Sequence, residues 1–382
     1  MTDKLSGPPS STRRGKRRRS SSKRRQRIKR WRQIGSWVLL VLLLGLLLRW
    51  LGGYRPAPAV YSSHSQHQAL VQLPRDDAPH DDYMEWWYYN GHLKADDGRE
   101  FSFHYVFFVV NSAVGYTVAH VALTDHQTLK RYSFQKETTG NPSFGTQERF
   151  GFVLGDLAMT GGGGKDTLKA KTRDFAFELK LENSAPAVLQ GGTGLLDFHQ
   201  GGTSYYYSRP RMKVLGTLLL RGKPIAVTGE SWFDHQWGDF HPPSLTWNWF
   251  ALQLDDGADI MLYQLTDGSS ALPMFSGTYT RNGRTEVLHE PEVSLSSTST
   301  WISPATAIPY PIAWHVRIPK HGIDVKVVPV MQNAEVDSRQ TTHTIYWEGA
   351  VKVAGSHTGK GFLEVNPTQE KKAPKKGPAD GR

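Results

Sequence analysis

The chain has 382 residues, enough for two ordinary domains, and no cysteine, which excludes disulfides, thiolate nucleophiles and cysteine-ligated zinc. Its formal net charge is +11, but residues 1–35 hold 14 Lys and Arg against one acid. The remaining 32 basic residues (46 minus 14) and 34 acidic residues (35 minus 1) nearly cancel. We therefore expect no nucleic-acid partner for the body of the chain, because phosphate contacts need a basic face.

An apolar run follows the basic tail at 1–33. Residues 34–53 (IGSWVLLVLLLGLLLRWLGG) predict a single transmembrane helix, with Arg49 reaching the membrane interface. The basic flank predicts a cytoplasmic N-terminus, so we expect a single-pass protein of the cell membrane, anchored in the inner membrane with the bulk of the chain in the periplasm. Cleavage at the A-x-A site at 57–59 is the alternative and gives a secreted protein.

The body of the chain alternates apolar and polar residues with a period of two. It lies between a Pro/Ser/Gln-rich linker at 54–75 and a solvated, disordered tail at 366–382. Roughly sixteen candidate strands are separated by turn signals. They predict an all-β fold of two tandem barrels, at 76–243 and 244–365, because one small barrel cannot hold so many strands. The clearest runs are FSFHYVFFVV (101–110), TVAHVALT (117–124), FAFELKLE (175–182) and WNWFALQL (247–254), with turns at Asp97-Gly98, Asp256-Gly257 and Asn282-Gly283.

Two familiar motifs fail on inspection. GGGGKDT (161–167) resembles a phosphate-binding loop, but Asp166 stands where Ser or Thr is needed and Met159 replaces the first glycine. We expect a flexible hairpin loop there. GESWF (229–233) begins like a nucleophile elbow, but Phe233 replaces the closing glycine. The sequence therefore gives no support for a serine hydrolase.

Two aromatic stretches carry most of the polar candidates. In EWWYYNGHL (85–93), strand alternation places Trp86, Tyr88 and His92 on one face and Glu85, Trp87 and Tyr89 on the other. In GESWFDHQWGDF (229–240), Trp232 and Asp234 share one face, and His235 and Trp237 share the opposite face with Phe233. Asp234 and His235 therefore cannot form a dyad with each other, and each must find a partner on another strand.

Three interpretations of these buried polar residues stay open. They form a hydrogen-bonded clasp between two barrels, they carry out acid–base or ligand-orienting chemistry, or they hold a metal. The metal is the least favoured because the histidines are scattered and show no close pair at ligand spacing on one strand; no metal and no cofactor is predicted. These histidines are His92, His104, His120, His199, His235 and His241.

The concentration of tryptophan suits core packing and also an apolar ligand cavity with a few fixed polar contacts. If His235 and Trp237 line that cavity, their face points into it and Asp234 points to the other buried face. The predicted ligand-binding residues are Trp86, Trp87, Tyr88, His92, Trp232, Trp237, Trp247 and Trp249.

Taken in order, EWWYYNGHL, GESWFDHQWG, WNWFALQLDDGADIMLYQL, YPIAWHVRIP and IYWEGAVKVAG resemble the AttH-type lipocalin-like family, which includes carotenoid 1,2-hydratase. The resemblance covers about 76–365 and implies two lipocalin-like barrels in tandem. It also implies acid-catalysed hydration of an isoprenoid, with His235 and Trp237 matching the His-x-Trp element. Tyr263 matches the Tyr of a Tyr-x-Asp element, but Leu265 stands at the Asp position, which removes the expected acid.

Two functions follow. The first is a carotenoid-hydratase-like enzyme (a hydro-lyase) that acts on an isoprenoid or lipid at the barrel junction, with His235, Asp234, Glu85 and Tyr263 as catalytic candidates. The second is a non-catalytic carrier of a hydrophobic molecule, or an accessory protein of a transport permease. Some members of the family occur alongside such permeases, and many are labelled secreted hydrolases, a label that the failed serine motif does not support.

Overall fold

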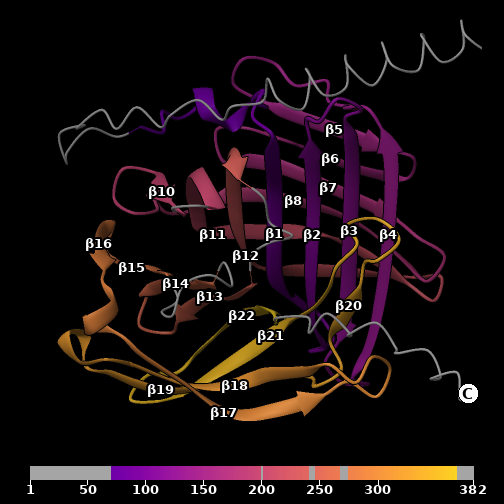
Figure 1. Ribbon diagram of the computed structural model, residues 1–382. Coiled ribbons are helices and arrows are strands. Elements are labelled where there is room, and N and C mark those ends of the chain that lie inside the picture. Colours follow the sequence, from indigo (N-terminus) through magenta and orange to yellow (C-terminus); the bar gives the residue numbers. More distant parts are fainter. Residues whose placement is uncertain (1–69, 199–200, 241–245, 267–273, 368–382) are drawn as a thin grey trace, which may run out of the picture. The chain divides into compact units, whose positions relative to one another are not determined.

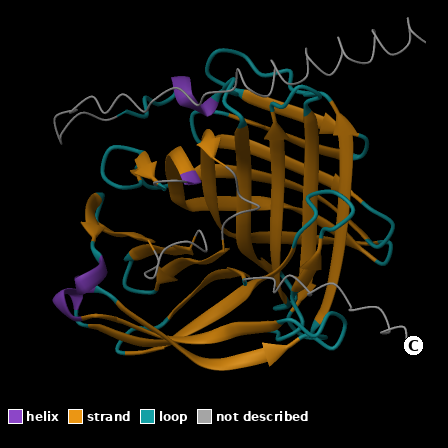
Figure 2. Cartoon of the chain, in the orientation of Figure 1, coloured by secondary structure: helices purple, strands orange, loops and turns teal. Residues whose placement is uncertain are grey.

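The computed structural model describes residues 70–198, 201–240, 246–266 and 274–367, and these residues form two β-sheets (Figures 1 and 2). In these ranges there is no α-helix, only short 3-10 turns such as Arg75–Asp77. No helix among the described residues is long and apolar enough to cross a membrane. The predicted transmembrane segment at 34–53 and most of the linker lie outside the described residues. The all-β prediction is confirmed.

The first sheet contains the first twelve strands, in the order β4-β3-β2-β1-β12-β11-β8-β7-β6-β5, with β9 and β10 paired to β11. It curls until its edge strands β4 and β5 come into contact without pairing, which makes a nearly closed barrel. The strands are β1 (Met84–Ala95), β2 (Glu100–Val110), β3 (Tyr116–Asp125), β4 (Lys130–Thr139), β5 (Phe150–Leu154), β6 (Leu157–Gly161), β7 (Lys165–Lys171), β8 (Phe175–Asn183), β9 (Val188–Leu189), β10 (Leu195–Asp197), β11 (Gly202–Leu220) and β12 (Lys223–Phe240).

The second sheet follows the order β16-β15-β14-β13-β22-β21-β19-β18-β17, with β20 paired to β21. Its edge strands β16 and β17 do not pair in the described residues, so the second of the two predicted barrels is a half-barrel. The strands are β13 (Thr246–Leu254), β14 (Asp259–Thr266), β15 (Met274–Arg281), β16 (Arg284–Leu288), β17 (Ser294–Ile302), β18 (Pro309–Ile318), β19 (Ile323–Pro329), β20 (Glu335–Asp337), β21 (Ile345–Gly355) and β22 (Gly359–Asn366).

The strands form where two-residue alternation is strongest. In β8 the buried and exposed residues alternate, so one face packs inside the barrel and the other meets solvent. β1 and β2 are buried on nearly every residue because both of their faces are covered. The strands that the sequence does not reveal, such as β9 and β20, have only two and three residues, too few to show a period.

The predicted turns lie between paired strands. Asn282-Gly283 joins β15 to β16 with positive φ at both residues, as a two-residue hairpin turn requires. The glycine run at 161–164 turns the chain from β6 to β7, which confirms a hairpin in place of a phosphate loop. Asp166, the residue that spoils the phosphate-loop motif, is buried and accepts the Gly162 N–H at 2.9 Å.

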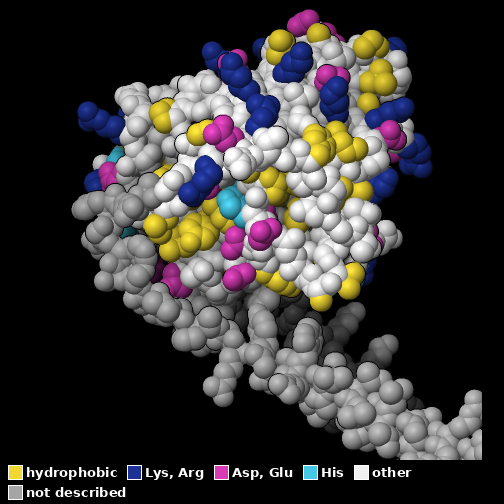
Figure 3. All heavy atoms as spheres, turned by 90° about the horizontal axis from the view of Figure 1, so that it is seen from above, with side chains coloured by type: hydrophobic (Ala, Val, Ile, Leu, Met, Phe, Trp, Pro, Cys, Tyr) yellow, Lys and Arg dark blue, Asp and Glu magenta, His cyan; other side chains and the backbone are white. Residues whose placement is uncertain are grey.

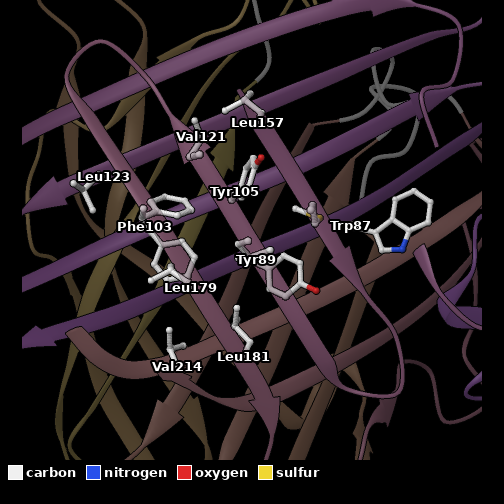
Figure 4. Packing of buried hydrophobic residues seen from close by; sticks show 14 of the residues in the cluster. Trp87, Tyr89, Phe103, Tyr105, Val121, Leu123, Leu157, Leu179, Leu181 and Val214 are labelled. Atoms are coloured by element: carbon white, nitrogen blue, oxygen red, sulfur yellow. The ribbon is translucent and has the colours of Figure 1, made fainter. Parts of the chain in front are cut away.

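Large aromatic and aliphatic side chains fill the first barrel. Trp87, Tyr89, Phe103 and Tyr105 are fully buried or nearly so and come from β1 and β2, while Leu157, Leu179, Leu181 and Val214 face them from strands of the opposite wall (Figure 4). Full burial of one such side chain contributes roughly 1.5–3 kcal/mol. The barrel interior is therefore mostly packed core.

A third cluster of buried side chains joins the two sheets. It takes Tyr88, Tyr206 and Trp232 from the first sheet and Trp249 and Phe362 from the second. The outer face of β1 and β12 is thus covered by β13, β14, β21 and β22. The described part of the first sheet ends with Phe240 and the second sheet begins with Thr246; the residues between them, including His241, lie outside the described residues, as does His199.

Two further features concern the ends and the surface. Asn366, predicted to begin a solvated tail, is buried as the last residue of β22, and the remainder of that tail from 368 lies outside the described residues. On the face seen in Figure 3, basic and acidic side chains are interspersed with hydrophobic ones.

Candidate functional site

β1 and β12 are antiparallel neighbours, with Trp87 opposite His235 and Tyr88 opposite Asp234. Because successive side chains of a strand point to opposite faces, the pair divides its residues between two places. Trp87, with Phe233 and Trp237 of β12, lies in the barrel core, whereas Tyr88 lies in the cluster between the sheets. The alternation predicted from the sequence is confirmed.

Inside the barrel, Glu85 is the centre of a buried polar group. Its Oε1 lies 2.7 Å from His80 Nδ1 and 2.8 Å from His235 Nε2, and its Oε2 accepts the His80 backbone N–H at 2.8 Å. Glu85 and His235 are fully buried, while the side chain of His80 is 21% exposed. No local sequence pattern predicts that Glu85 and His235 meet; the pairing of β1 with β12 brings them together.

A buried ion pair between Asp77 and Arg209 lies beside this group, and Tyr207 connects the two. Tyr207 donates its hydroxyl proton to Asp77 Oδ1 and lies 3.4 Å from His235 Nδ1. Asp77 Oδ2 accepts Arg209 Nη2 at 2.9 Å and the Gly163 N–H at 2.8 Å. The buried carboxylate of Asp77 is thus neutralised by a buried guanidinium, as charge burial requires.

The pKa values of the two histidines of this group are shifted in opposite directions. Burial lowers the pKa of His235, against the hydrogen bond and charge of Glu85. Burial also acts to lower the pKa of His80, but the hydrogen bond and charge of Glu85 outweigh it, with help from Asp76, and the pKa is raised. His235 is therefore a neutral imidazole near pH 7.

Between the sheets lies a cavity of about 150 Å³. This volume is similar to that of an apolar protein cavity that admits benzene. Its wall is mostly aromatic and aliphatic, with carboxyl groups from each sheet. The lining residues are Met84, Trp86, Tyr88, Val106, Phe108, Val110, Tyr116, Val118, His120, Tyr206, Asp234, Gln236, Phe240, Trp247, Trp249, Tyr263, Thr342, Thr344, Tyr346, Glu364 and Asn366.

Asp234 is the carboxyl group of the first sheet in this wall. It accepts hydrogen bonds from the Tyr206 hydroxyl (2.7 Å), Ser208 Oγ (2.5 Å) and Trp232 Nε1 (2.7 Å). Burial raises the pKa of Asp234 to about 7, since all three donors are neutral and only partly offset the loss of water. Tyr206 in turn accepts Trp249 Nε1 at 3.0 Å, which links Asp234 to the second sheet.

Glu364 of β22 is the carboxyl group of the second sheet. It is half-buried and accepts the Trp247 indole N–H at 3.0 Å. Trp249 lies opposite both Tyr263 on β14 and Glu364 on β22, so the three side chains share one face. Burial, the charge of Glu348 and the charge of Asp234 raise the pKa of Glu364 well above its usual value. The carboxyl of Glu364 therefore keeps its proton to higher pH than an ordinary glutamate.

Glu348 lies directly opposite Glu364 across β21 and β22. Its oxygens lie 2.5 Å from the Tyr88 hydroxyl and 2.7 Å from His104 Nδ1. Burial acts to raise the pKa of Glu348, but His104, the Tyr88 hydrogen bond and the positive charge of Arg131 outweigh it, and the pKa is lowered. The pKa values of two facing glutamates are thus shifted in opposite directions, a pattern that marks acid–base sites.

A model of the AttH-like family matches residues 64–367. The chain belongs to this family. The family resemblance predicted from the sequence is confirmed.

Solved structures agree with this AttH-like assignment. An AttH protein from Nitrosomonas europaea is 29% identical with a TM-score of 0.70, covering 81% of this chain and 99% of that chain. Kievitone hydratase from Nectria haematococca shares the fold at 18% identity and a TM-score of 0.68, covering 79% of this chain and 94% of its own. CghA, solved with Sch210972, shares it at 9% identity and a TM-score of 0.51, covering 74% and 88% respectively. No curated protein matches the chain.

The AttH-like fold separates the predicted site residues into two groups. Those at the cavity are Asp234, Tyr263, Trp86, Tyr88, Trp247 and Trp249, with Trp232 packed beside them through its bond to Asp234. Those inside the barrel are Glu85, Trp87, His235 and Trp237. His92 is at the junction but outside the cavity lining, with Nε2 3.1 Å from the Gly361 carbonyl.

This cavity therefore lies on the face of Asp234, whereas Trp237 and the side chain of His235 lie on the opposite face, inside the barrel. Sequence reasoning also missed Glu364 and His80. For Glu364 the sequence does hold a usable signal, because this glutamate lies in the middle of an apolar strand, GFLEVN. His80 precedes β1 in an acidic lead, and no spacing rule connects it to His235.

Proposed function

We propose that this AttH-like protein binds an apolar isoprenoid or lipid in the cavity between its sheets and hydrates a carbon–carbon double bond by acid–base catalysis. The observation that carries the proposal is the Glu348–Glu364 pair, which raises the pKa of Glu364 in the wall of an aromatic cavity. A proton donor in a mostly apolar wall is what protonation of an alkene needs. Kievitone hydratase, a hydratase by name, has the same fold.

The proposed step transfers one proton in and one proton out. Glu364 gives its carboxyl proton to one alkene carbon, and the π electrons form the new C–H bond, which leaves a carbocation on the other carbon. A water oxygen bonds to that carbon and releases a proton to Asp234, whose pKa of about 7 leaves it partly ionised at neutral pH. Proton exchange with water restores both carboxyl groups, and the net reaction adds one H and one OH.

The wall suits a cationic intermediate and a small reacting group. The faces of Trp86, Trp249 and Tyr263 offer π electron density, which stabilises a nearby cation by about 0.5–2 kcal/mol each. A cavity of about 150 Å³ holds a group the size of one ring or one isoprene unit. Only the reacting end of a long ligand would enter it.

The alternative is a carrier that binds the same ligand without turnover. It is favoured by Leu265, a buried apolar residue on β14 where the family resemblance expects an aspartate. In both cases the predicted anchor at 34–53 would hold the cavity beside the inner membrane on the periplasmic side, close to a permease partner. Alkaline carbonate extraction tests the anchor: a chain released by carbonate, or a soluble form beginning near Val60, would show that the apolar segment does not retain it.

The test of function starts with mass spectrometry of the apolar molecules that co-purify with the full chain. Each is then incubated in ¹⁸O-labelled water with wild type, Glu364→Gln and Glu230→Gln, a matched change at a carboxylate outside the cavity. We expect ¹⁸O in the product, a rate loss of about 10²–10⁴-fold for Glu364→Gln with binding retained, and no loss for Glu230→Gln. A Glu364→Gln variant of full activity would refute the assignment of the acid. Binding without label incorporation by wild type would favour the carrier.

A further inference from the structure

The buried group inside the first barrel takes no part in the chemistry proposed for the cavity. His80 comes from the segment before β1, Glu85 from β1 and His235 from β12. One donor atom from each lies within 4.8 Å of the other two. Glu85 Oε1 lies between the two imidazole nitrogens, at 2.7 Å and 2.8 Å. Three potential ligands thus converge on one point from three parts of the chain.

The surroundings of His235 are compatible with a ligand role for its Nε2. Tyr207 gives its hydroxyl proton to Asp77, so the Tyr207 oxygen is free to accept from His235 Nδ1, 3.4 Å away. In the tautomer with the proton on Nδ1, the lone pair of Nε2 lies on the side of Glu85 Oε1, as an imidazole ligand of a metal ion requires.

All three side chains are also held in place by neighbours, as metal ligands usually are. Glu85 Oε2 accepts the His80 backbone N–H at 2.8 Å. The His80 ring stacks on Trp237 at 4.1 Å and 3°, and the His235 ring stacks on Trp87 at 4.5 Å. His235 Nδ1 contacts Tyr207. These contacts fix the direction in which each donor atom points.

We propose that His80, Glu85 and His235 bind one divalent transition-metal ion, for which Zn²⁺ fits best. Two histidines and one glutamate with a fourth position for water is a common zinc donor set. Ligand bonds of about 2.0–2.2 Å in a tetrahedron put donor atoms about 3.4 Å apart, so each distance from Glu85 Oε1 to a histidine nitrogen needs to lengthen by about 0.6–0.7 Å. The partly exposed His80 gives the ion its entry. Once bound, it ties the segment before β1 to the barrel wall.

The test measures Zn²⁺ stoichiometry by elemental analysis and calorimetry on the metal-stripped full chain, with Co²⁺ as a spectroscopic probe. The variants are His80→Gln, Glu85→Gln and, as matched control, His315→Gln, which removes a histidine 2.7 Å from Asp324 on the surface. We expect wild type and His315→Gln to bind one equivalent that His80→Gln and Glu85→Gln lose. Wild type should show the visible bands of four-coordinate Co²⁺, and Zn²⁺ should raise its Tm by several degrees but leave the Tm of His80→Gln unchanged.

His80→Gln is the deciding variant because its partly exposed side chain can be replaced with the core intact, and circular dichroism verifies that the variant is folded. Equal Zn²⁺ stoichiometry in folded wild type and folded His80→Gln, or no binding by wild type, overturns the proposal and leaves a hydrogen-bonded clasp. These readouts involve no turnover, so they are independent of the fate of the hydration proposal.

Discussion

The region around Glu348 and the cavity beside Glu364 both take a carboxyl group out of water, fully for Glu348 and partly for Glu364, but they shift its pKa in opposite directions. Glu348 lies among His104, Tyr88 and Arg131, and its pKa is lowered. Glu364 contacts the neutral indole of Trp247 and faces the charge of Glu348, and its pKa is raised. Burial opposes ionisation in both, so the charge of the partner decides the outcome. In this molecule the charge of Glu348 helps to set the acidity of Glu364 in the cavity wall.

The largest expected effect comes from removing the charge at Glu348. Glu348→Gln removes one partner of the buried His104–Glu348 pair, and breaking such a pair costs about 3–5 kcal/mol. The free energy of unfolding, measured with urea at pH 7, should fall by that amount. In the folded fraction the pKa of Glu364 should also fall, visible as a shift of any pH–rate profile to lower pH. A loss below about 1 kcal/mol would mean that Glu348 is not the counter-charge of this cluster.

The second effect tests the cavity side through pH. The pKa of Asp234 is about 7 in the folded chain against about 3.9 unfolded, so between these values the folded state holds a proton that the unfolded state has released. Stability should therefore be fully present below pH 4 and fall as pH rises to 7, by up to ~1.4 kcal/mol per pH unit.

Asp234→Asn removes this slope. The neutral amide gives Tyr206, Ser208 and Trp232 a poorer acceptor, so the variant should be less stable than wild type at pH 4, with the gap narrowing by up to ~4 kcal/mol by pH 8. Asp166 and Asp259, whose pKa values are raised to about 6 by burial, remain in both proteins and cancel in the difference. Parallel stability curves for the two proteins would show that Asp234 is ionised throughout this range.

A smaller effect is expected where the two sheets are linked. Tyr206→Phe removes the hydroxyl between Asp234 and Trp249 and should cost about 1–2 kcal/mol of unfolding free energy. Tyr205→Phe, one residue earlier with its ring stacked on Trp237 inside the barrel, is the control. Equal losses in both variants would argue against a link between the sheets at Tyr206.

The smallest effect is expected at Glu364 itself. Glu364→Gln replaces a carboxyl whose raised pKa favours its neutral form with a neutral amide of the same shape that still accepts the Trp247 N–H, so the free energy of unfolding should change by less than about 1 kcal/mol at pH 7. Thermal unfolding of Glu364→Gln and Glu348→Gln under the same conditions compares the two losses of stability. A destabilisation as large as that of Glu348→Gln would show that Glu364 is charged in the folded protein.

The sequence predicts strands and faces well because both depend on a local period of two. It separates Trp86 and Tyr88 from Glu85 and Trp87, and Asp234 from His235, as the structure does. It does not predict the contacts that depend on which strands pair. The meeting of Glu85 with His235, and of Glu348 with Glu364, depends on which strands are neighbours and in what register, and a single sequence contains no signal for either. The second sheet's open edge is missed for the same reason.

The pairing of β1 with β12 also governs how the chain reaches this structure. Glu85 and His235 touch across 150 positions of sequence, and Trp247 and Glu364 across 117. Such distant contacts slow folding, because a long loop must close before any of the contact energy is gained. During synthesis neither sheet can be completed until its last strand has left the ribosome, and the cavity, which needs β22, forms last. We therefore expect slow, late folding in which ligand binding appears together with the final core.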